Sequence, residues 1–216
     1  MKYKNIVEAT FLDRPNRFIA HVLVDGVKET VHVKNTGRCR EILLPGSRVI
    51  LEKSDNPERK TKYDLVTALK EPVGWINIDS QAPNKIAHEW LERFEYDYIK
   101  PEYTYGKSRI DFYMEKDGEK YLMEVKGCTL ERDMKGYFPD APTERGVKHI
   151  YELMGAAREG YHAMLVFVIQ MDGITEVFPN GDTDPAFEEA FYEAEKNGVE
   201  IVFIPCKVTK NEVVAV

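Results

Sequence analysis

The order of expected strands and helices constrains the fold most, because it divides the 216 residues into two parts with different patterns. Residues 5–78 hold short runs rich in β-branched and aromatic residues, separated by turn formers such as Asp25-Gly26 and Pro45-Gly46. From residue 85 onward, helical and strand-like runs alternate, which is typical of a sheet covered by helices. We therefore expect a β-barrel domain over residues 1–82 and an α/β domain over residues 83–216.

The pattern of the first part predicts a small barrel. Its expected strands are residues 5–12, 17–24, 30–33, 48–53, 63–70 and 74–78, with a short helix over residues 37–44. Five or six short strands with a helix between the third and the fourth favour a partly open barrel of the oligonucleotide-binding (OB) type. Such barrels bind single strands with basic and aromatic side chains. The alternative is a β-barrel that serves only in packing.

The pattern of the second part predicts a mixed sheet flanked by helices. The expected helices are residues 85–94, 144–158 and 185–197, and the expected strands are residues 99–105, 109–115, 120–125, 162–170 and 199–205. With 43% apolar residues, the chain has enough apolar material for a real core. The longest apolar run is too short to span a bilayer, and the N-terminal segment is too polar for a signal peptide. Three cysteines without a CxxC pair indicate neither a disulfide framework nor a zinc site, so we expect a soluble, cytoplasmic protein with no membrane partner.

The net charge of −7 argues against a nucleic-acid partner, but the charge is unevenly distributed. Residues 1–82 carry 14 Lys and Arg against 11 Asp and Glu, whereas residues 83–216 carry 16 against 26. The basic excess of the first part allows a local basic surface. The acidic second part suits a metal site as well as ordinary solubility. Total charge therefore does not decide which partner the chain binds.

Asp117-Gly118 is a strong signal for a two-residue hairpin, because both central positions of a type I′ turn need positive φ. A turn at this point places Asp111 directly opposite Glu124, and Arg109 directly opposite Lys126. These side chains share one face, since side chains alternate along a strand. The other face is apolar and is the expected core side, with Ile110, Phe112, Met114, Tyr121, Met123 and Val125.

Two directly opposed carboxylates repel each other unless a cation lies between them. Mg²⁺ or Mn²⁺ would relieve the repulsion, since hard cations take oxygen ligands. Lys126 could then orient a metal-bound water or stabilise a phosphate. Because metal-assisted phosphodiester hydrolysis needs this set, Asp111, Glu124 and Lys126 are candidate catalytic residues, the two acids being the candidate metal ligands. The alternative is a surface lattice of salt bridges in which Arg109 and Lys126 neutralise the acids.

A second polar cluster lies where a loop enters the helix expected over residues 144–158. Thr143 can cap this helix, and Glu144 favours its positive end. Arg145 and His149 share a helix face and could reach a phosphate, the alternative being a solvated charged face. Gly146, early in a helix, suggests close approach by another backbone or a ligand. The buried stripe is expected at Val147, Ile150, Tyr151 and Met154.

Four ordered motifs extend over nearly the whole chain. They are Asn35-Thr36-Gly37-Arg38 with Glu41-Ile42-Leu43-Leu44-Pro45-Gly46, Ser108-Arg109-Ile110-Asp111-Phe112, Glu124-Val125-Lys126-Gly127-Cys128-Thr129-Leu130, and Phe138-Pro139-Asp140-Ala141-Pro142-Thr143-Glu144-Arg145-Gly146-Val147-Lys148-His149. In these motifs the chain resembles the sugar fermentation stimulation protein family. The resemblance implies an OB-type barrel followed by a nuclease-like domain of the PD-(D/E)xK class. It also implies DNA binding and a role in regulating genes of sugar utilisation, such as maltose genes.

The resemblance also implies roles for individual residues. In the PD-(D/E)xK class, the first acid falls on Asp111, and the acid-x-lysine motif falls on Glu124 and Lys126. An upstream helical acid often joins them, and Glu89 and Glu92 are the candidates. The proline that names the motif is absent, since Ile110 precedes Asp111. The family is known chiefly for DNA binding, which leaves catalysis open at this point.

The remaining candidate contacts are basic residues of the barrel, which would bind phosphates without reading sequence. They are Lys34, Arg38, Arg40 and Arg48, with Arg14 and Arg17 as further candidates. No helix-turn-helix or zinc-finger pattern is present, so we expect DNA binding with little sequence specificity. One hypothesis is therefore a DNA-binding regulatory protein, and the second is an active Mg²⁺- or Mn²⁺-dependent nuclease of DNA or RNA. A structural or protein-interaction module is the third.

Overall fold

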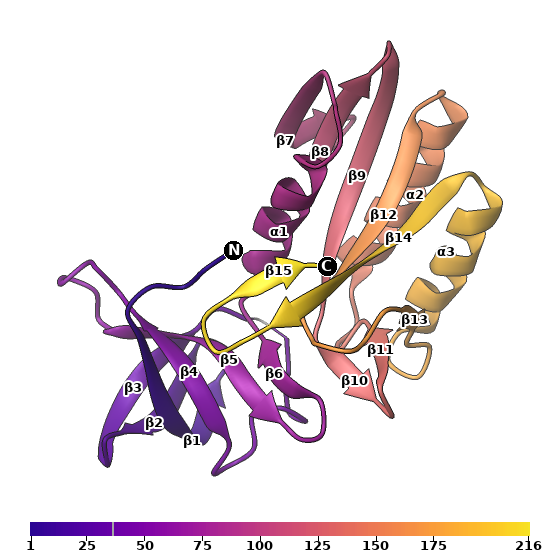
Figure 1. Cartoon of the computed structure of the whole chain (residues 1–216). Coiled ribbons are helices and arrows are strands. Elements are labelled where there is room, and N and C mark those ends of the chain that lie inside the picture. The colour runs from indigo at the N-terminus through magenta and orange to yellow at the C-terminus, as the bar shows by residue number, and fades with distance from the viewer. Residues whose placement is uncertain (36) are drawn as a thin grey trace.

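The first part of the chain folds into a closed β-barrel (Figure 1). The computed structural model describes residues 1–35 and 37–216. Each of β1 to β5 pairs with two others in the barrel, because the row β3-β2-β1-β4-β5 is closed by a parallel pairing of β3 with β5. This closure confirms the predicted OB-type barrel. The strands are β1 (Ile6–Asn16), β2 (Ile19–Val24), β3 (Val27–Val33), β4 (Arg48–Lys53), β5 (Tyr63–Lys70) and, added beside β5, β6 (Gly74–Asn77).

The segment between β3 and β4 does not contain the helix predicted over residues 37–44. Residues 37–47 form turns and irregular backbone instead. Cys39 has a positive φ of 45°, which interrupts any right-handed helix. The guanidinium of Arg14, at the end of β1, also donates hydrogen bonds to the carbonyls of Gly37 and Arg38. The side chain of Arg14, from β1, therefore holds this segment in a non-helical conformation.

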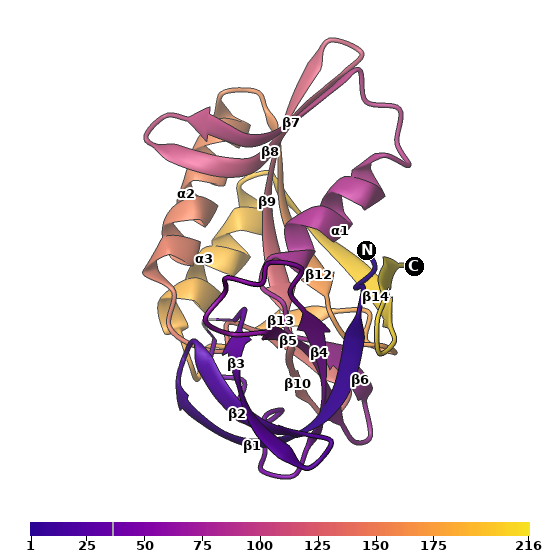
Figure 2. The same ribbon diagram turned by 90° about the vertical axis from the view of Figure 1, so that its left-hand side faces the viewer.

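The second part forms the predicted mixed sheet, which has six strands and carries helices on both faces (Figures 1 and 2). The strand order is β15-β14-β12-β9-β8-β7, in which β12 is parallel to both β14 and β9. Helix α1 packs on one face, and α2 and α3 pack on the other. No described helix is long and apolar enough to cross a membrane. The elements are α1 (Ala82–Leu91), β7 (Tyr98–Tyr105), β8 (Ser108–Lys116), β9 (Glu119–Cys128), β10 (Leu130–Arg132), β11 (Lys135–Phe138), α2 (Glu144–Arg158), β12 (His162–Ile169), β13 (Val177–Pro179), α3 (Pro185–Lys196), β14 (Val199–Val208) and β15 (Val213–Ala215).

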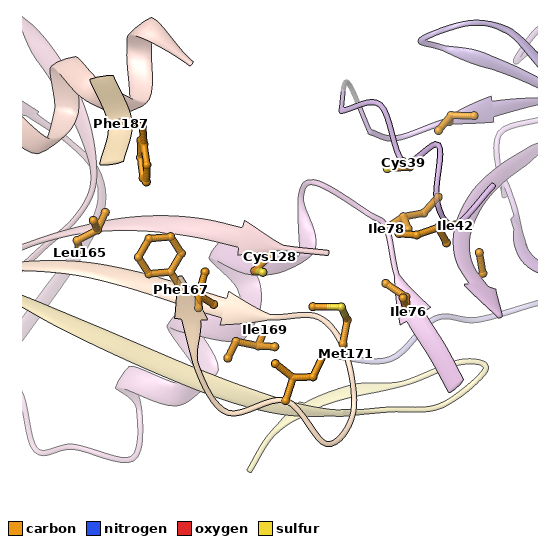
Figure 3. Packing of buried hydrophobic residues seen from close by; sticks show 14 of the residues in the cluster. Cys39, Ile42, Ile76, Ile78, Cys128, Leu165, Phe167, Ile169, Met171 and Phe187 are labelled. Carbon is orange, nitrogen blue, oxygen red and sulfur yellow. The ribbon is translucent and has the colours of Figure 1, made fainter. Parts of the chain in front are cut away.

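Both faces of the large sheet are buried, which corrects the expectation of a single core face. The central strand β12 is apolar along almost its whole length, as is typical of a strand covered on both sides. On the face of α2 and α3, Phe167 packs near Phe187 in a cluster that continues into the barrel. Figure 3 shows this continuity, which runs through Met171 to Ile76. The two parts of the chain therefore share this apolar cluster.

A buried hydrogen-bond network also joins the barrel to the second part. Asn77, at the end of β6, donates to the Tyr3 hydroxyl at 2.9 Å and accepts from Gln170 Nε2 at 2.7 Å. The Tyr3 hydroxyl in turn donates to Asp79 at 3.1 Å. Buried polar groups are costly to leave unpaired, so this network fixes the two parts against each other. The domain boundary between residues 82 and 83 stays a prediction.

Candidate functional site

The hairpin of β8 and β9 has the predicted register. Phe112 pairs with Met123, and the ladder continues to the turn, where Asp117 and Gly118 both have positive φ, 54° and 82°. On the side away from the turn, the ladder ends at Phe112. Asp111 therefore does not form a ladder pair with Glu124. The strands separate at this point, directly beside the two candidate metal ligands.

The Asp111 carboxylate lies where the two strands separate. Its Oδ2 accepts the backbone N–H of Val125 at 2.8 Å, so a side chain replaces the main chain as the partner of β9. Its Oδ1 accepts Nδ2 of Asn84, in the first turn of α1, at 2.7 Å. Burial and the nearby charge of Glu124 raise the pKa of Asp111. A cation at this carboxylate would offset both effects.

Glu124 is only 3% exposed and is held by two side chains. Its Oε1 accepts from Lys126 Nζ at 2.5 Å and is hydrogen-bonded to Nδ1 of His149 on α2. Its Oε2 is buried without a hydrogen-bond partner among the described residues. Burial alone would raise the pKa of Glu124, but the hydrogen bond with His149 and the Lys126 charge lower it. The structure thus presents an ionised carboxylate with one free buried oxygen.

The burial of Glu124 also decides against the surface salt-bridge lattice. Arg109 has a largely exposed side chain and pairs with Glu102 at 3.6 Å, not with either candidate ligand. Of the two cations in that alternative, Lys126 alone contacts one of the acids, Glu124. Glu124 is paired through Oε1 only, and a buried oxygen without a partner is costly, so this arrangement calls for a further partner at Oε2.

Helix α1 reaches this site because Gly127 lets it approach β9. A Cβ atom on Gly127 would lie 2.6 Å from Cγ of Pro83 and 2.4 Å from Oε1 of Gln170. Pro83 lies just before Asn84 in the first turn of α1. The glycine therefore sets the position from which Asn84 binds Asp111. Sequence reasoning missed Asn84 and Gln170, although a glycine inside a strand pattern is a known sign of close backbone approach.

Neither Glu89 nor Glu92 contacts Asp111 directly. Both line a cavity of about 460 Å³ whose wall also includes Asp111. Glu89 binds the terminal amino group of Met1 at 2.7 Å, and Glu92 lies 3.6 Å from His88. The α1 side chain that binds Asp111 is an amide, Asn84. The helical acid implied by the family class therefore has no counterpart in direct contact with Asp111 among the described residues.

His149 does not have the predicted exposed position. It is 4% exposed and binds Glu124, and Nε of Arg145 donates to its Nε2 at 3.4 Å. It lies in the wall of a cavity of about 390 Å³, where Arg145, Lys107 and Lys148 are exposed. The predicted pair is thus divided, because Arg145 can reach a phosphate while His149 holds a carboxylate.

Two further expectations for α2 also need correction. Tyr151, which was expected in the buried stripe, is 48% exposed, whereas Leu153 is buried. Gly146 is approached by the N-cap of its own helix, since a Cβ on Gly146 would lie 2.8 Å from the Thr143 side chain. The Thr143 hydroxyl accepts the N–H of Gly146 at 3.0 Å, which is the expected cap.

Two of the predicted basic contacts in the barrel are occupied by carboxylates. Lys34 is surrounded by Asp64, Asp79 and Glu52, with Nζ–O distances of 3.4, 3.7 and 3.8 Å. Arg48 pairs with Glu8 at 2.5 Å. Both cations are thus partly neutralised by acids, and their role as phosphate contacts stays a prediction. The sequence could not show this, because the acids around Lys34 come from separate segments.

The other two predicted barrel cations lie together. Arg38 and Arg40 line a cavity of about 290 Å³ with Arg14 and Arg17. The backbone N–H of Arg38 donates to Oδ2 of Asp140, in the loop before α2, at 2.9 Å. Within the motif that begins at Asn35, Thr36 lies outside the described residues.

The donors at the site fit a divalent cation. Two carboxylates from adjacent strands lie close enough for one charge to affect the other, and one buried oxygen is free. Among the described residues, no group of three or more acids, histidines or cysteines could hold a metal ion by itself. Mg²⁺ is commonly held by one or two carboxylates and keeps several waters. Asp111 and Glu124 would supply the protein ligands, and water would fill the other positions.

Comparisons with known proteins agree with this two-part architecture. The family model "SfsA N-terminal OB domain" matches residues 12–78, and the model "Sugar fermentation stimulation protein RE domain" matches residues 81–212. A sugar fermentation stimulation protein homolog from Desulfitobacterium hafniense (strain DSM 10664 / DCB-2) is 51% identical over 218 residues, covering 100% of this chain and 95% of the relative. The homolog from Ruminiclostridium cellulolyticum is 50% identical over 212 residues, covering 96% and 93%.

A solved structure extends the comparison to three dimensions. Pyrococcus furiosus SfsA in complex with Ca²⁺ has a TM-score of 0.87 and 29% identity, and the match covers 100% of this chain and 95% of that one. The similarity therefore includes both the barrel and the helix-flanked sheet. On the two family models and the full-length relatives, the chain belongs to the sugar fermentation stimulation protein family.

Proposed function

We propose that this protein binds nucleic acid and hydrolyses phosphodiester bonds with a divalent cation held by Asp111 and Glu124. The observation that carries the proposal is the free, buried Oε2 of Glu124 beside a second carboxylate. A protein that only bound phosphates would gain nothing from two neighbouring acids, one of them buried, which repel an anion when no cation is present. The Ca²⁺ in the P. furiosus relative supports a cation with oxygen ligands.

Each residue of the site has a distinct part in the proposed reaction. Asp111 and Glu124 bind the cation, which is Mg²⁺ or Mn²⁺ on the chemistry of the donors. Once bound, such a cation lowers the pKa of water and stabilises charge on the phosphate. The ammonium of Lys126 donates to Oε1 of Glu124, so it lies beside the proposed cation. It orients the attacking water or stabilises the charge that develops on the phosphate. The exposed guanidinium of Arg145 positions the phosphate.

His149 acts on this site through Glu124. Arg145 donates to Nε2 of the ring, so Nδ1 carries the proton that Glu124 Oε1 accepts. With Lys126 on the same oxygen, Oε1 is saturated and Oε2 is directed to the cation. His149 is therefore a positioning residue in the proposal.

A second candidate function is DNA binding without hydrolysis, in a protein that regulates sugar-utilisation genes such as those for maltose. The absence of a third acid, histidine or cysteine ligand within the described residues favours this candidate. So does the hydrogen bond between Asn84 and Asp111, since it occupies one carboxylate oxygen without supplying charge. The regulatory role itself derives from the family resemblance.

The two candidates are separated by a cleavage assay. Purified protein is incubated with labelled single- and double-stranded DNA and RNA in the presence of Mg²⁺, Mn²⁺ or a chelator. Hydrolysis predicts cleavage that needs the metal and is lost in Asp111→Ala and Glu124→Gln. Exposed Arg158→Gln, at the end of α2 where the arginine donates to Asn197, is the control and leaves cleavage unchanged. Binding without cleavage under every condition contradicts hydrolysis and leaves the second candidate.

A further inference from the structure

We propose that Arg17, Arg38 and Arg40 form a phosphate-binding pocket on the barrel that holds the backbone of a single-stranded nucleic acid whose other end lies at the metal site. This inference rests on the proposed function and extends it to the class of substrate. These three residues and the cavity of about 290 Å³ that they line form the arginine pocket.

The arginine pocket is a group of cations that have no acidic partners among the described residues. None of its three guanidinium groups lies within 4.0 Å of a carboxylate oxygen of a described residue. By contrast, Lys34 and Arg48 are paired with carboxylates. In a chain with a net charge of −7, three arginines that line one cavity without ion pairs favour binding of an anion, although the Asp140 carboxylate accepts from the backbone N–H of Arg38 beside them.

The walls of the arginine pocket are held in place before any ligand binds. Arg14 donates to the carbonyls of Asn35 at 2.5 Å, Gly37 at 2.9 Å and Arg38 at 3.0 Å on one side of the pocket. It also donates to the carbonyl of Arg17 on the other side, at 2.7 Å. Arg14 therefore holds the two sides of the pocket together and does not bind the phosphate. Because the loops are already ordered, little ordering cost opposes binding.

An exposed aromatic ring lies at the edge of the pocket. The Arg17 guanidinium lies 4.8 Å from the ring centroid of Phe18, and Phe18 is 45% exposed. An unpaired base can stack on such a ring, and bases of a duplex cannot without leaving their partners. The combination of arginines and an exposed ring therefore favours a single strand over a duplex.

The arginine pocket is connected to the metal site by a short segment. The N–H of Arg38 binds Asp140, and a Cβ on Gly37 would lie 2.4 Å from the same carboxylate oxygen. From Asp140 the chain runs to the Thr143 cap of α2, which carries Arg145 beside the site. Figure 2 shows the barrel below the second part of the chain. A strand held at the barrel can thus continue to Arg145.

The test measures binding of a fluorescent oligothymidylate to the full chain at several salt concentrations, with chelator present so that no cleavage occurs. Each phosphate contact on a single strand contributes about −0.7 to the slope of log K against log salt. Arg38→Gln with Arg40→Gln is expected to make the slope shallower by about 1.4. Phe18→Ala is expected to weaken binding by about five- to a hundred-fold with the slope unchanged. Arg158→Gln, whose arginine donates to Asn197 at the end of α2, is the control and keeps the wild-type slope.

The outcomes distinguish this inference from the proposed function. An unchanged slope in the double variant, or an equal change of slope in Arg158→Gln, overturns the arginine pocket even if the protein cleaves. A double variant with the shallower slope supports the pocket even if no cleavage is ever seen. A duplex of the same sequence that binds as tightly as the single strand, with no effect of Phe18→Ala, overturns the single-strand assignment. Thermal melting of each variant shows that it is folded.

Discussion

His149 and Lys126 bind the same oxygen atom of Glu124, Oε1, and leave Oε2 without a protein partner among the described residues. The imidazole comes from α2 and the ammonium from β9, so two elements fix one carboxylate. A second-sphere hydrogen bond of this kind orients a metal ligand. The geometry of Glu124 therefore depends on how α2 packs against the sheet.

Removing the imidazole is expected to weaken cation binding. His149→Ala should lower Mn²⁺ affinity by about 10- to 100-fold, because loss of an outer-sphere partner has effects of this size. Titration calorimetry with Mn²⁺ measures the change. Tyr151→Ala, on the exposed side of the same helix, is the control and should bind Mn²⁺ as the wild type does. Equal affinities for His149→Ala and wild type would show that Glu124 is not oriented by His149.

Gly127→Ala is expected to be destabilising, because the added Cβ would lie 2.6 Å from the rigid Pro83 ring. Overpacking of this kind costs about 1–3 kcal/mol, which urea unfolding can measure. The shift of α1 should also disturb the Asn84–Asp111 contact and so lower Mn²⁺ affinity. Gly155→Ala is a matched control, since its Cβ would meet nothing within 4 Å, and alanine favours a helix. If Gly127→Ala is as stable as the wild type, α1 does not pack against Gly127 of β9 as closely as described.

Asp64 gives a prediction for the dependence of stability on pH. Burial alone would raise its pKa, but hydrogen bonds from Arg59 and His32 and the charge of Lys34 lower the pKa to about 2, from the usual value of 3.8 for an aspartate. A folded-state pKa below the unfolded value stabilises the protein above the unfolded pKa, and this stability is lost as the pH falls toward 2. The wild type should exceed Asp64→Asn by about 2 kcal/mol at pH 5, and this gap should shrink by about 1 kcal/mol at pH 3. A gap that stays constant between the two pH values contradicts the prediction.

Much of the fold could be predicted because its signals are local. The turn at Asp117-Gly118 determined the register of β8 and β9, and alternating short strands indicated the barrel. The strands β10, β11 and β13 could not be predicted, since each has only three or four residues and β11 pairs with a strand far along the chain. The helix expected over residues 37–44 failed because Arg14 binds the carbonyls of that segment.

The sequence predicted the two acids of the candidate site, but not which side chains lie around them. Spacing alone brought Asp111, Glu124 and Lys126 together as candidates. Spacing also placed His149 on a solvent-facing side of the helix, whereas the residue is buried. A buried histidine that binds a carboxylate has the same sequence pattern as an exposed one. The acidic partners of Lys34 could not be predicted for a similar reason, since they come from three segments that meet only in the fold.

The most direct test of the central proposal is a Mn²⁺ titration of the wild type and of Glu124→Gln. Calorimetry or electron paramagnetic resonance of free Mn²⁺ reports the number of bound ions and their affinity. The proposal predicts one saturable site in the wild type and its loss in the isosteric variant, with a rise in the melting temperature only where the ion binds. If the wild type binds no Mn²⁺ at millimolar concentration, or Glu124→Gln binds it equally well, Glu124 is not a metal ligand and the proposed hydrolytic function is contradicted.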